Sequence, residues 1–173
     1  MPDRDSTSFR LHCVTGDPRW AAVPDLAGLC ARVARACQPA INSSGVSGAS
    51  GAPSVLEATI LLTDDARIRD LNARFRNQDK PTNVLSFASE DEEPDAESGA
   101  FYLGDIAISY ETVRREAEDS GKSLRAHLTH LIVHGVLHLA GFDHENDAEA
   151  DEMEAQEIEI LLGLGIVDPY MAV

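Results

Sequence analysis

The feature that most constrains this chain is an apolar segment, residues 124–140, that carries histidines at helical spacing. The segment reads LRAHLTHLIVHGVLHLA and is apolar enough to form a buried helix, yet His134 and His138 lie four residues apart in it. Four residues along an α-helix correspond to about 6 Å of rise and about 40° of rotation, so both imidazoles project from one face. The pair can therefore converge on a single metal ion.

A glycine at the end of this segment allows a third histidine to return to the pair. Gly141 can adopt the left-handed conformation that ends a helix, and His144 follows three residues later. Three imidazoles leave one coordination position open, which is typical of a catalytic rather than a structural zinc site. The pattern HxxxHxxGxxH thus predicts that His134, His138 and His144 bind one metal ion per chain. Zn2+ is the expected ion, although imidazole also suits other divalent transition metals.

The same spacing leaves a metalloprotease-like hydrolase open as an alternative. In metzincin proteases a glutamate directly after the first histidine acts as the general base. Gly135 holds that position here, so the route lacks its proton acceptor. Two further histidines, His127 and His130, share the face of His134. They either line a cleft beside the metal or pack at a helix interface.

Length and composition favour a cytoplasmic single-domain protein. The 173 residues can bury one sizeable core but are too few for two comfortable domains, so we expect one domain over 1–173. No basic leader and no run of roughly 18 apolar residues is present, which predicts no export and no membrane partner. The three cysteines lack CxxC spacing and suit a reducing compartment.

The charge is strongly acidic but unevenly distributed. The net charge of −16 argues against nonspecific nucleic-acid binding through overall charge, and we expect no DNA partner. Of the 30 acidic residues, six fall in 90–97 and nine between Asp143 and Glu159. Residues 66–80, by contrast, hold five basic and two acidic residues. This segment can form a local cationic patch on an acidic protein.

Hydrophobic periodicity predicts an α+β fold: a small mixed sheet of about four strands packed against several helices, with the metal site at the end of a long central helix. A segment rich in Gly, Ser and Ala, about 39–54, is predicted to be a flexible connection within the domain. In the last helix we expect Met153, Ile158, Leu161 and Leu162 to face the core. The predicted strands are 8–15, 54–63, 83–89 and 100–109, and the predicted helices are 24–38, 64–76, 110–119, 124–140 and about 147–162.

Four stretches of the chain together resemble the YbeY family of bacterial endoribonucleases. They are HGVLHLAGFDH (134–144), RNQDKPTNVLSF (76–87), LGDIAIS (103–109) and MEAQEIEILLGLGIVDPY (153–170). The likeness covers about residues 55–170, whereas residues 1–54 correspond only loosely. It implies a zinc-dependent, single-strand-specific endoribonuclease that matures ribosomal RNA, notably the 3′ end of the small-subunit RNA, and acts in ribosome quality control. The ribosome or its small subunit is the implied partner.

The resemblance also implies His134, His138 and His144 as metal ligands and Arg76 as the basic catalytic residue. Cleavage of a phosphodiester builds negative charge that a Lewis-acidic metal and a guanidinium can stabilise. The planar donors of Arg76 can grip a phosphate with two hydrogen bonds. Whether water or the RNA 2′-hydroxyl attacks is left open.

Four further residues are candidates for orienting the metal ligands or contacting substrate. Asp143 can orient an imidazole or form a turn, and Asp105 is an acid within a predicted strand. The other two are His130 and Lys80. A last alternative is a ribosome-associated RNA-binding protein in which the metal only stabilises the fold.

Overall fold

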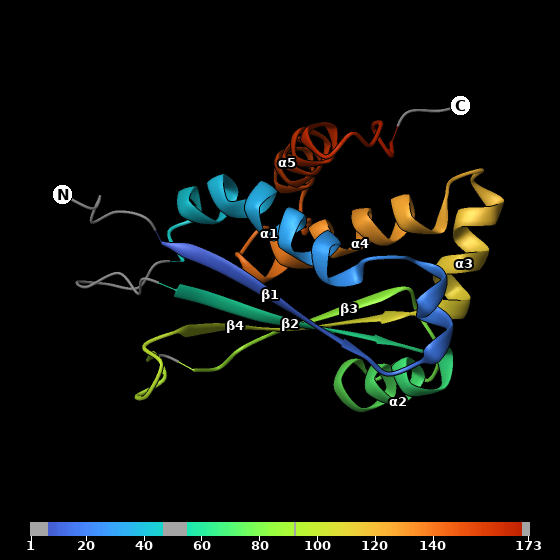
Figure 1. The fold of residues 1–173 in the computed structure, drawn as a ribbon, viewed down its shortest axis with the longest axis horizontal. Helices are drawn as coiled ribbons and strands as arrows, with labels where there is room; N and C mark the ends of the chain where they lie inside the picture. Colours follow the sequence, from blue (N-terminus) through green and yellow to red (C-terminus); the bar gives the residue numbers. More distant parts are fainter. Residues whose placement is uncertain (1–6, 47–54, 92, 171–173) are drawn as a thin grey trace.

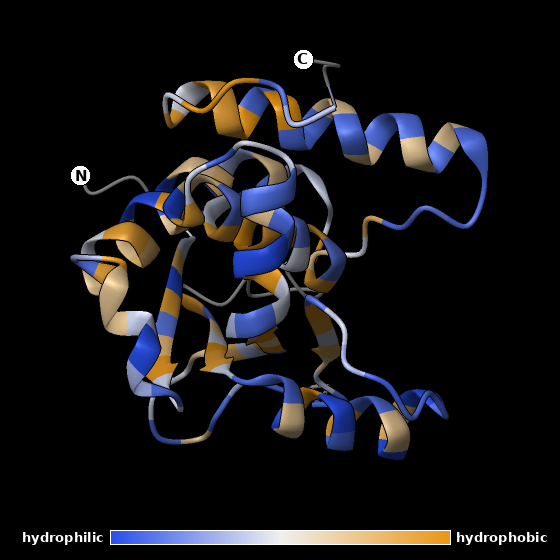
Figure 2. Ribbon diagram, turned by 90° about the vertical axis from the view of Figure 1, so that its right-hand side faces the viewer, coloured by the Kyte–Doolittle hydropathy of each residue, from blue (hydrophilic) through white to orange (hydrophobic). Residues whose placement is uncertain are grey.

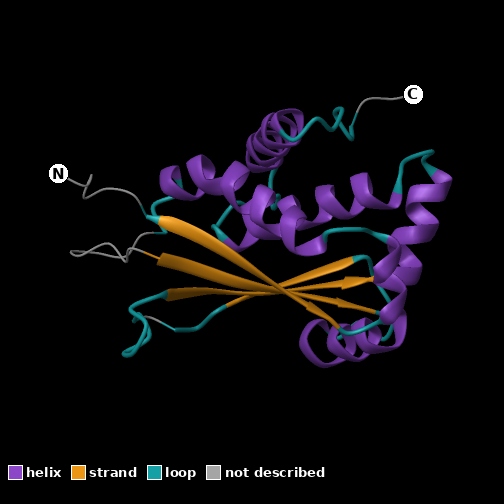
Figure 3. Ribbon diagram, in the orientation of Figure 1, coloured by secondary structure: helices purple, strands orange, loops and turns teal. Residues whose placement is uncertain are grey.

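Four strands form one mixed sheet at the centre of the molecule (Figures 1 and 3). The computed structural model describes residues 7–46, 55–91 and 93–170. The strand order is β1-β2-β4-β3; β1, β2 and β4 run parallel, and β3 pairs antiparallel with β4 at one edge. The α+β prediction is confirmed. The strands are β1 (Ser8–Thr15), β2 (Val55–Thr63), β3 (Val84–Ala88) and β4 (Phe101–Ser109).

The helices cover the two faces of the sheet unequally. In Figure 1, α1, α4 and α5 lie on one side of the sheet and α2 on the other, while α3 stands at one end. Hydrophobic residues gather where the strands meet the helices above them, whereas α2 is largely hydrophilic (Figure 2). The helices are η1, a 3-10 helix (Pro18–Ala22), α1 (Leu26–Ser43), α2 (Asp65–Arg76), α3 (Tyr110–Asp119), α4 (Leu124–Leu139) and α5 (Asp147–Gly163).

Helix α4 is the central helix of the core, as predicted. Its hydroxyl cap is Ser123, whose Oγ accepts a hydrogen bond from the Ala126 N–H at 3.0 Å. Leu128, Ile132, Val136 and Leu137 are all fully buried. Gly135 lets α4 approach β4 closely, because a Cβ there would lie 3.0 Å from two carbon atoms of Ile106.

A bulge in β4 sets the position of the edge strand β3. The β2–β4 register shifts between Glu57 and Ala58, and Gly104 follows the shift with a φ of 140°. A Cβ at Gly104 would lie 2.1 Å from the Phe87 carbonyl oxygen of β3. Only glycine therefore allows β3 to pair so closely at this point.

The N-terminal half shows two differences from the sequence-based expectation. Helix α1 continues through Pro39 to Ser43, five residues into the segment expected to be a flexible connection. Buried Ala40 and Ile41 explain the extension, because their packing offsets the hydrogen bond that a proline removes from a helix. Residues 47–54 of the same segment lie outside the described residues. The short helix η1 was not predicted.

One expected core position in α5 is wrong. Leu162 is 58% exposed and Ile158 is half-buried, whereas Met153, Ile160 and Leu161 face the core. None of the helices in the described part of the chain combines the length and apolarity needed to cross a membrane.

Candidate metal centre and active site

The histidines of the motif come together at the end of α4. His134 and His138 lie on one face of the helix, and their Nε2 atoms are 3.0 Å apart. The ring of His144 lies 5.1 Å from that of His138 and 6.1 Å from that of His134, measured between centroids. One ring nitrogen of each histidine lies within 4.8 Å of the other two. In the described part of the chain, this is the one group of three or more metal-binding side chains so arranged.

The chemistry and spacing of these donors fit one metal ion. A tetrahedral zinc ion with bonds of 2.0 to 2.1 Å holds its ligand atoms roughly 3.3 Å apart. The His134–His138 pair is already close to this separation, and the exposed His144 offers a ring nitrogen within 4.8 Å of both. Burial, together with the neighbouring His134 and His144, lowers the pKa of His138 below its ordinary value of 6.5. His138 is therefore neutral at pH 7, which is the form that binds a metal.

The turn that returns His144 follows from the helix end. Gly141 has a φ of 95°, and the Phe142 N–H reaches back to the Leu137 carbonyl at 3.0 Å, as in a left-handed helix cap. Asp143 Oδ1 then accepts a hydrogen bond from the His144 backbone N–H at 2.7 Å. Asp143 therefore holds the turn, which is the simpler of its two predicted roles, and contacts the backbone of His144 rather than its ring.

A buried carboxylate orients the first histidine of the motif. Glu157 of α5 has no exposed surface and accepts hydrogen bonds from His134 Nδ1, from the Tyr170 hydroxyl and, at 3.2 Å, from His130 Nε2. Burial raises the pKa of Glu157, but these three hydrogen bonds outweigh it and lower the pKa to about 2. An ionised carboxylate only accepts, so the proton of His134 lies on Nδ1 and the lone pair of Nε2 points to the site.

Glu157 and Tyr170 were missed by the sequence reasoning, which treated the acids of α5 as a group. A signal was present: Met153, Glu157 and Leu161 are spaced by four residues and share the buried face. His130 is linked to the site by Glu157 and by an edge-to-face contact with the His134 ring, with centroids 6.4 Å apart. His127 is buried and bonded to Glu116 at 2.7 Å, so it packs at a helix interface, the second of its two predicted roles.

Arg76 lies at the rim of the same site. It is the last residue of α2, and its Nη2 donates to the Ser86 carbonyl of β3 at 2.8 Å. We use the name histidine hollow for the hollow of about 440 Å³ that Arg76 shares with Asn83, Ser86, His134, His138 and His144. The structure thus brings Arg76 and the three histidines, distant in sequence, into one hollow.

The structure does not bring the two remaining candidates into the histidine hollow. Lys80 is exposed beyond the end of α2 and is not part of its lining. Asp105 faces the α2 side of the sheet, because alternate residues of a strand point to opposite faces and Ile106 faces α4. Its carboxylate accepts a hydrogen bond from the Tyr102 hydroxyl at 2.6 Å.

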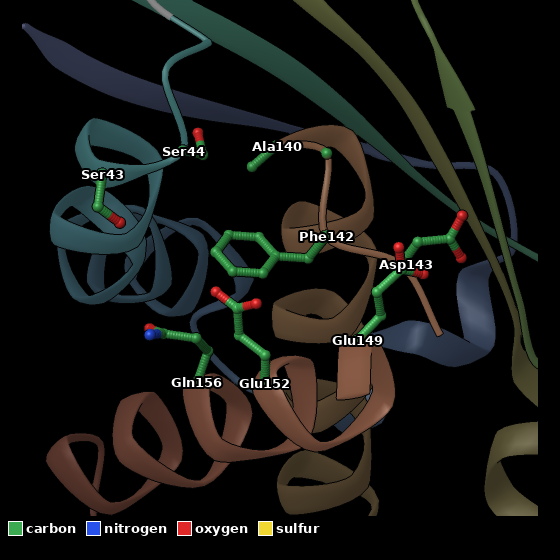
Figure 4. Close-up of a pocket in the computed structure, with 9 residues that line it drawn as sticks. Ser43, Ser44, Ala140, Phe142, Asp143, Glu149, Glu152 and Gln156 are labelled. Carbon is green, nitrogen blue, oxygen red and sulfur yellow. The ribbon is translucent and has the colours of Figure 1, made fainter. Parts of the chain in front are cut away.

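A second cavity near the motif is acidic and separate. Figure 4 shows Phe142 pointing into the space between α1 and α5, with Glu152 and Gln156 projecting from α5. This cavity of about 390 Å³ also contains Asp143 and Glu149 and shares no lining residue with the histidine hollow. Its carboxylates would repel a polyanion, so the histidine hollow is the better candidate for a phosphate-containing substrate.

The fold and site can be compared with known proteins. A solution structure of TM1509 from Thermotoga maritima has a TM-score of 0.54 and 20% sequence identity, covering 95% of this chain and 99% of that one. This likeness supports the fold alone. Endoribonuclease YbeY of Chelativorans sp. (strain BNC1) is 49% identical over 168 residues, which are 97% of this chain and 97% of that protein.

Endoribonuclease YbeY of Rhodopseudomonas palustris (strain HaA2) is 59% identical over 121 residues, 66% of this chain. The chain spans 61% of the length of that relative. The family model described as Endoribonuclease YbeY matches residues 31–165, which reaches further toward the N-terminus than the sequence motifs indicated. The match covers most of the chain and all three histidines of the motif. The chain therefore belongs to the YbeY family.

Proposed function

We propose that the chain is a metal-dependent endoribonuclease that cleaves single-stranded RNA. The observation that carries the proposal is the histidine hollow, in which the guanidinium of Arg76 faces the same space as three convergent imidazoles. The membership of the YbeY family supports RNA as the substrate. We further propose ribosomal RNA processing in the cytoplasm, including maturation of the 3′ end of the small-subunit RNA. We also propose that the protein acts in ribosome quality control, with the ribosome or its small subunit as its partner.

The residues of the histidine hollow would have separate roles in cleavage. His134, His138 and His144 would hold one Zn2+, which supplies Lewis-acid stabilisation of charge on a phosphate oxygen when bound. Arg76 would bind a second phosphate oxygen and stabilise the charge that develops during cleavage. Its contacts to the Ser86 carbonyl and the Phe87 ring hold the guanidinium at the rim. Those contacts use only some of its five N–H donors, so others can reach the substrate.

The protease alternative has no support from the geometry. In a metzincin, the glutamate after the first histidine must reach the substrate. A side chain at position 135 would instead point at the sheet, and its Cβ would lie 3.0 Å from two carbon atoms of Ile106. The position is therefore closed to a general base. The alternative of a purely structural metal is distinguished by the variants described next.

The test compares the wild-type protein with Arg76→Ala and His138→Ala on defined single-stranded and duplex RNA. Arg76→Ala should keep about one equivalent of metal, because Arg76 contacts no metal ligand, and should lose roughly 100- to 1,000-fold in kcat. His138→Ala should lose both the metal and the activity. Metal content is measured by atomic emission on each purified protein, in parallel with cleavage.

Arg114→Ala is a matched control, because Arg114 is exposed on α3 and bonded to Glu118. It should cleave RNA like the wild type. Wild-type cleavage that persists after chelation and in His138→Ala would sink the proposed active site. Metal-dependent melting with cleavage unchanged in Arg76→Ala would favour the structural-metal alternative.

A further inference from the structure

A second hollow lies on the other side of the edge strand β3, between α2 and the open face of the sheet. It has a volume of about 680 Å³ and is mainly apolar, with Leu71, Phe75 and Phe87 among the residues that line it. We use the name phenylalanine hollow for this space. A volume of this size is within the range of small-ligand sites in proteins, roughly 300–1,000 Å³.

Two aromatic rings in the phenylalanine hollow remain available for contact. Phe75 is 57% exposed, although it is a large apolar side chain, and Phe87 is half-buried. The rings meet edge to face, with centroids 5.4 Å apart and an interplanar angle of 63°. The exposed part of the Phe75 ring therefore offers apolar surface for a further contact.

The charge around these rings suits an anionic partner. Arg76 lies over Phe87 at 5.0 Å from the ring centroid, and Arg74 lies over Phe75 at 5.8 Å. Arg67 also lines the hollow, so the three arginines outnumber its two carboxylates, Glu90 and Asp105. On a chain with a net charge of −16, this group of arginines beside aromatic rings is an exception to the overall charge. Arginine next to an exposed aromatic ring is the combination that binds single-stranded nucleic acid.

The phenylalanine hollow and the histidine hollow adjoin each other on the two sides of one strand, β3. Arg76 and Ala88 line both hollows. Ser86 faces the histidine hollow and its neighbour Phe87 faces the phenylalanine hollow, as expected for successive residues of a strand. An RNA strand whose phosphate is held by Arg76, above the histidines, therefore has its neighbouring nucleotide at the mouth of the phenylalanine hollow.

We propose that the phenylalanine hollow binds one unstacked base of single-stranded RNA, adjacent to the phosphate held in the histidine hollow; this rests on the proposed endoribonuclease function. Phe75 stacks on the base, and Arg74 and Arg76 contact the flanking phosphates. Asp105 and Glu90, which also line the hollow, accept hydrogen bonds from exocyclic amino groups of the base. A base within a duplex is stacked and paired, so it cannot enter. The hollow therefore gives the selectivity for single strands a physical cause.

The test measures RNA binding and cleavage by Phe75 variants of the full chain. Phe75→Ala should bind a short single-stranded RNA roughly 5- to 100-fold more weakly, the range expected for loss of one stacked base. Phe75→Trp should restore binding, because it keeps a flat ring. Leu162→Ala is the matched control, since Leu162 is equally exposed but lies on α5. Affinities are measured by fluorescence anisotropy in the His138→Ala background, so that the RNA is not cut.

A second measurement identifies which base of the RNA occupies the phenylalanine hollow. In RNAs with one abasic position, His138→Ala should lose affinity when the missing base is at one position next to the cleaved bond, and the same variant with Phe75→Ala added should be indifferent to that position. In cleavage, Phe75→Ala should raise KM with little change in kcat. Affinity and KM that are unchanged in Phe75→Ala would overturn the base site and favour a protein partner for the hollow, while leaving the proposed function intact. Absence of RNA cleavage by the wild type would instead remove the proposed function itself.

Discussion

Glu157 is a buried charge that the fold retains beside the candidate metal ligands. An unpaired carboxylate without exposed surface would cost several kcal/mol. Three donors, His130, His134 and Tyr170, offset that cost. Two of the three come from α4 and one from the chain beyond α5, so the carboxylate joins separate elements at the site. Its position favours one tautomer of His134 and thereby the presentation of Nε2.

Replacing Glu157 tests this role without emptying the space it fills. Glu157→Gln removes the negative charge and leaves one acceptor oxygen for donors that now share two. The hydrogen bond from His134 Nδ1–H then weakens, and metal affinity should fall about 10- to 100-fold. The dissociation constant is measured by competition with a chromophoric chelator. Glu159→Gln is the control, because Glu159 is exposed on the same helix. An unchanged metal affinity in Glu157→Gln would show that the carboxylate is only structural.

The convergence of the three candidate metal ligands could be predicted from the sequence, whereas the residues that support them could not. His134, His138 and His144 are close in the chain, so the helical period and one glycine are enough to bring them together. Glu157 lies 23 residues from His134, and its contact depends on how α5 crosses α4. Asp105 shows the converse: its place in a strand was predicted correctly, but the face to which it points depends on the register of the sheet.

At the scale of elements, the packing of α4 on β4 depends on a residue without a side chain. Gly135→Ala gains about 1 kcal/mol of helix propensity but forces a methyl group against Ile106, and overpacking costs about 1–3 kcal/mol. We expect the free energy of unfolding to fall by up to about 2 kcal/mol, and by more in Gly135→Val. Urea denaturation followed by circular dichroism measures the change.

Gly163→Ala is the matched control for Gly135→Ala. Gly163 is also helical, at the end of α5, and a Cβ there would meet no atom within 4 Å. This variant should therefore be neutral or more stable by up to about 1 kcal/mol. Equal effects of the two substitutions would mean that α4 does not depend on close approach to the sheet.

Most elements could be predicted because hydrophobic period and caps agree locally. All four strands and the five α-helices match the predictions within a few residues, with Asp64 and Ser123 as caps. The exceptions depend on tertiary contacts. Helix α1 passes Pro39 because Ala40 and Ile41 are buried, and η1 is held by Trp20, whose Nε1 donates to the Thr63 carbonyl at 2.9 Å.

For the whole molecule, the metal is expected to tie the link between α4 and α5 to the core. His144 lies in this link, whereas His134 and His138 belong to α4. Free metal at 100 times its dissociation constant should stabilise the protein by about 2.7 kcal/mol. For a chain of this size, that corresponds to a rise in Tm of roughly 5–10 °C.

Chelation should reverse this rise, and calorimetry with and without chelator measures it. His144→Ala should melt like the chelated wild type and respond little to added metal, because the link is then no longer held. A wild-type Tm that does not respond to chelation would contradict the proposed attachment.

The separation of charge over the whole molecule predicts how RNA binding depends on salt. Binding to a single strand weakens with a log–log slope of about −0.7 for each phosphate that a cation neutralises. Arg67, Arg74 and Arg76 line or border the phenylalanine hollow, whereas Arg69 is already paired with Asp79 at 2.8 Å. The two arginines placed on phosphates, Arg74 and Arg76, predict a slope of about −1.4, and Arg67 as a third cation brings it to about −2. Fluorescence anisotropy in the His138→Ala background measures this slope between 0.05 and 0.3 M salt. The screening lengths at these concentrations are about 14 and 6 Å.

Acidic surface elsewhere on the chain should make the plot of log affinity against log salt concentration flatten at low salt. The screening length grows to about 30 Å at 0.01 M, so the RNA then also experiences the net charge of −16. Affinity should therefore stop rising as salt falls toward that concentration, unlike that of a uniformly basic protein. Arg74→Ala should reduce the slope by about 0.7, while Arg114→Ala should leave it unchanged. A slope near zero in the His138→Ala background would mean that RNA does not contact the cationic patch. The path from the histidine hollow to the phenylalanine hollow would then be wrong.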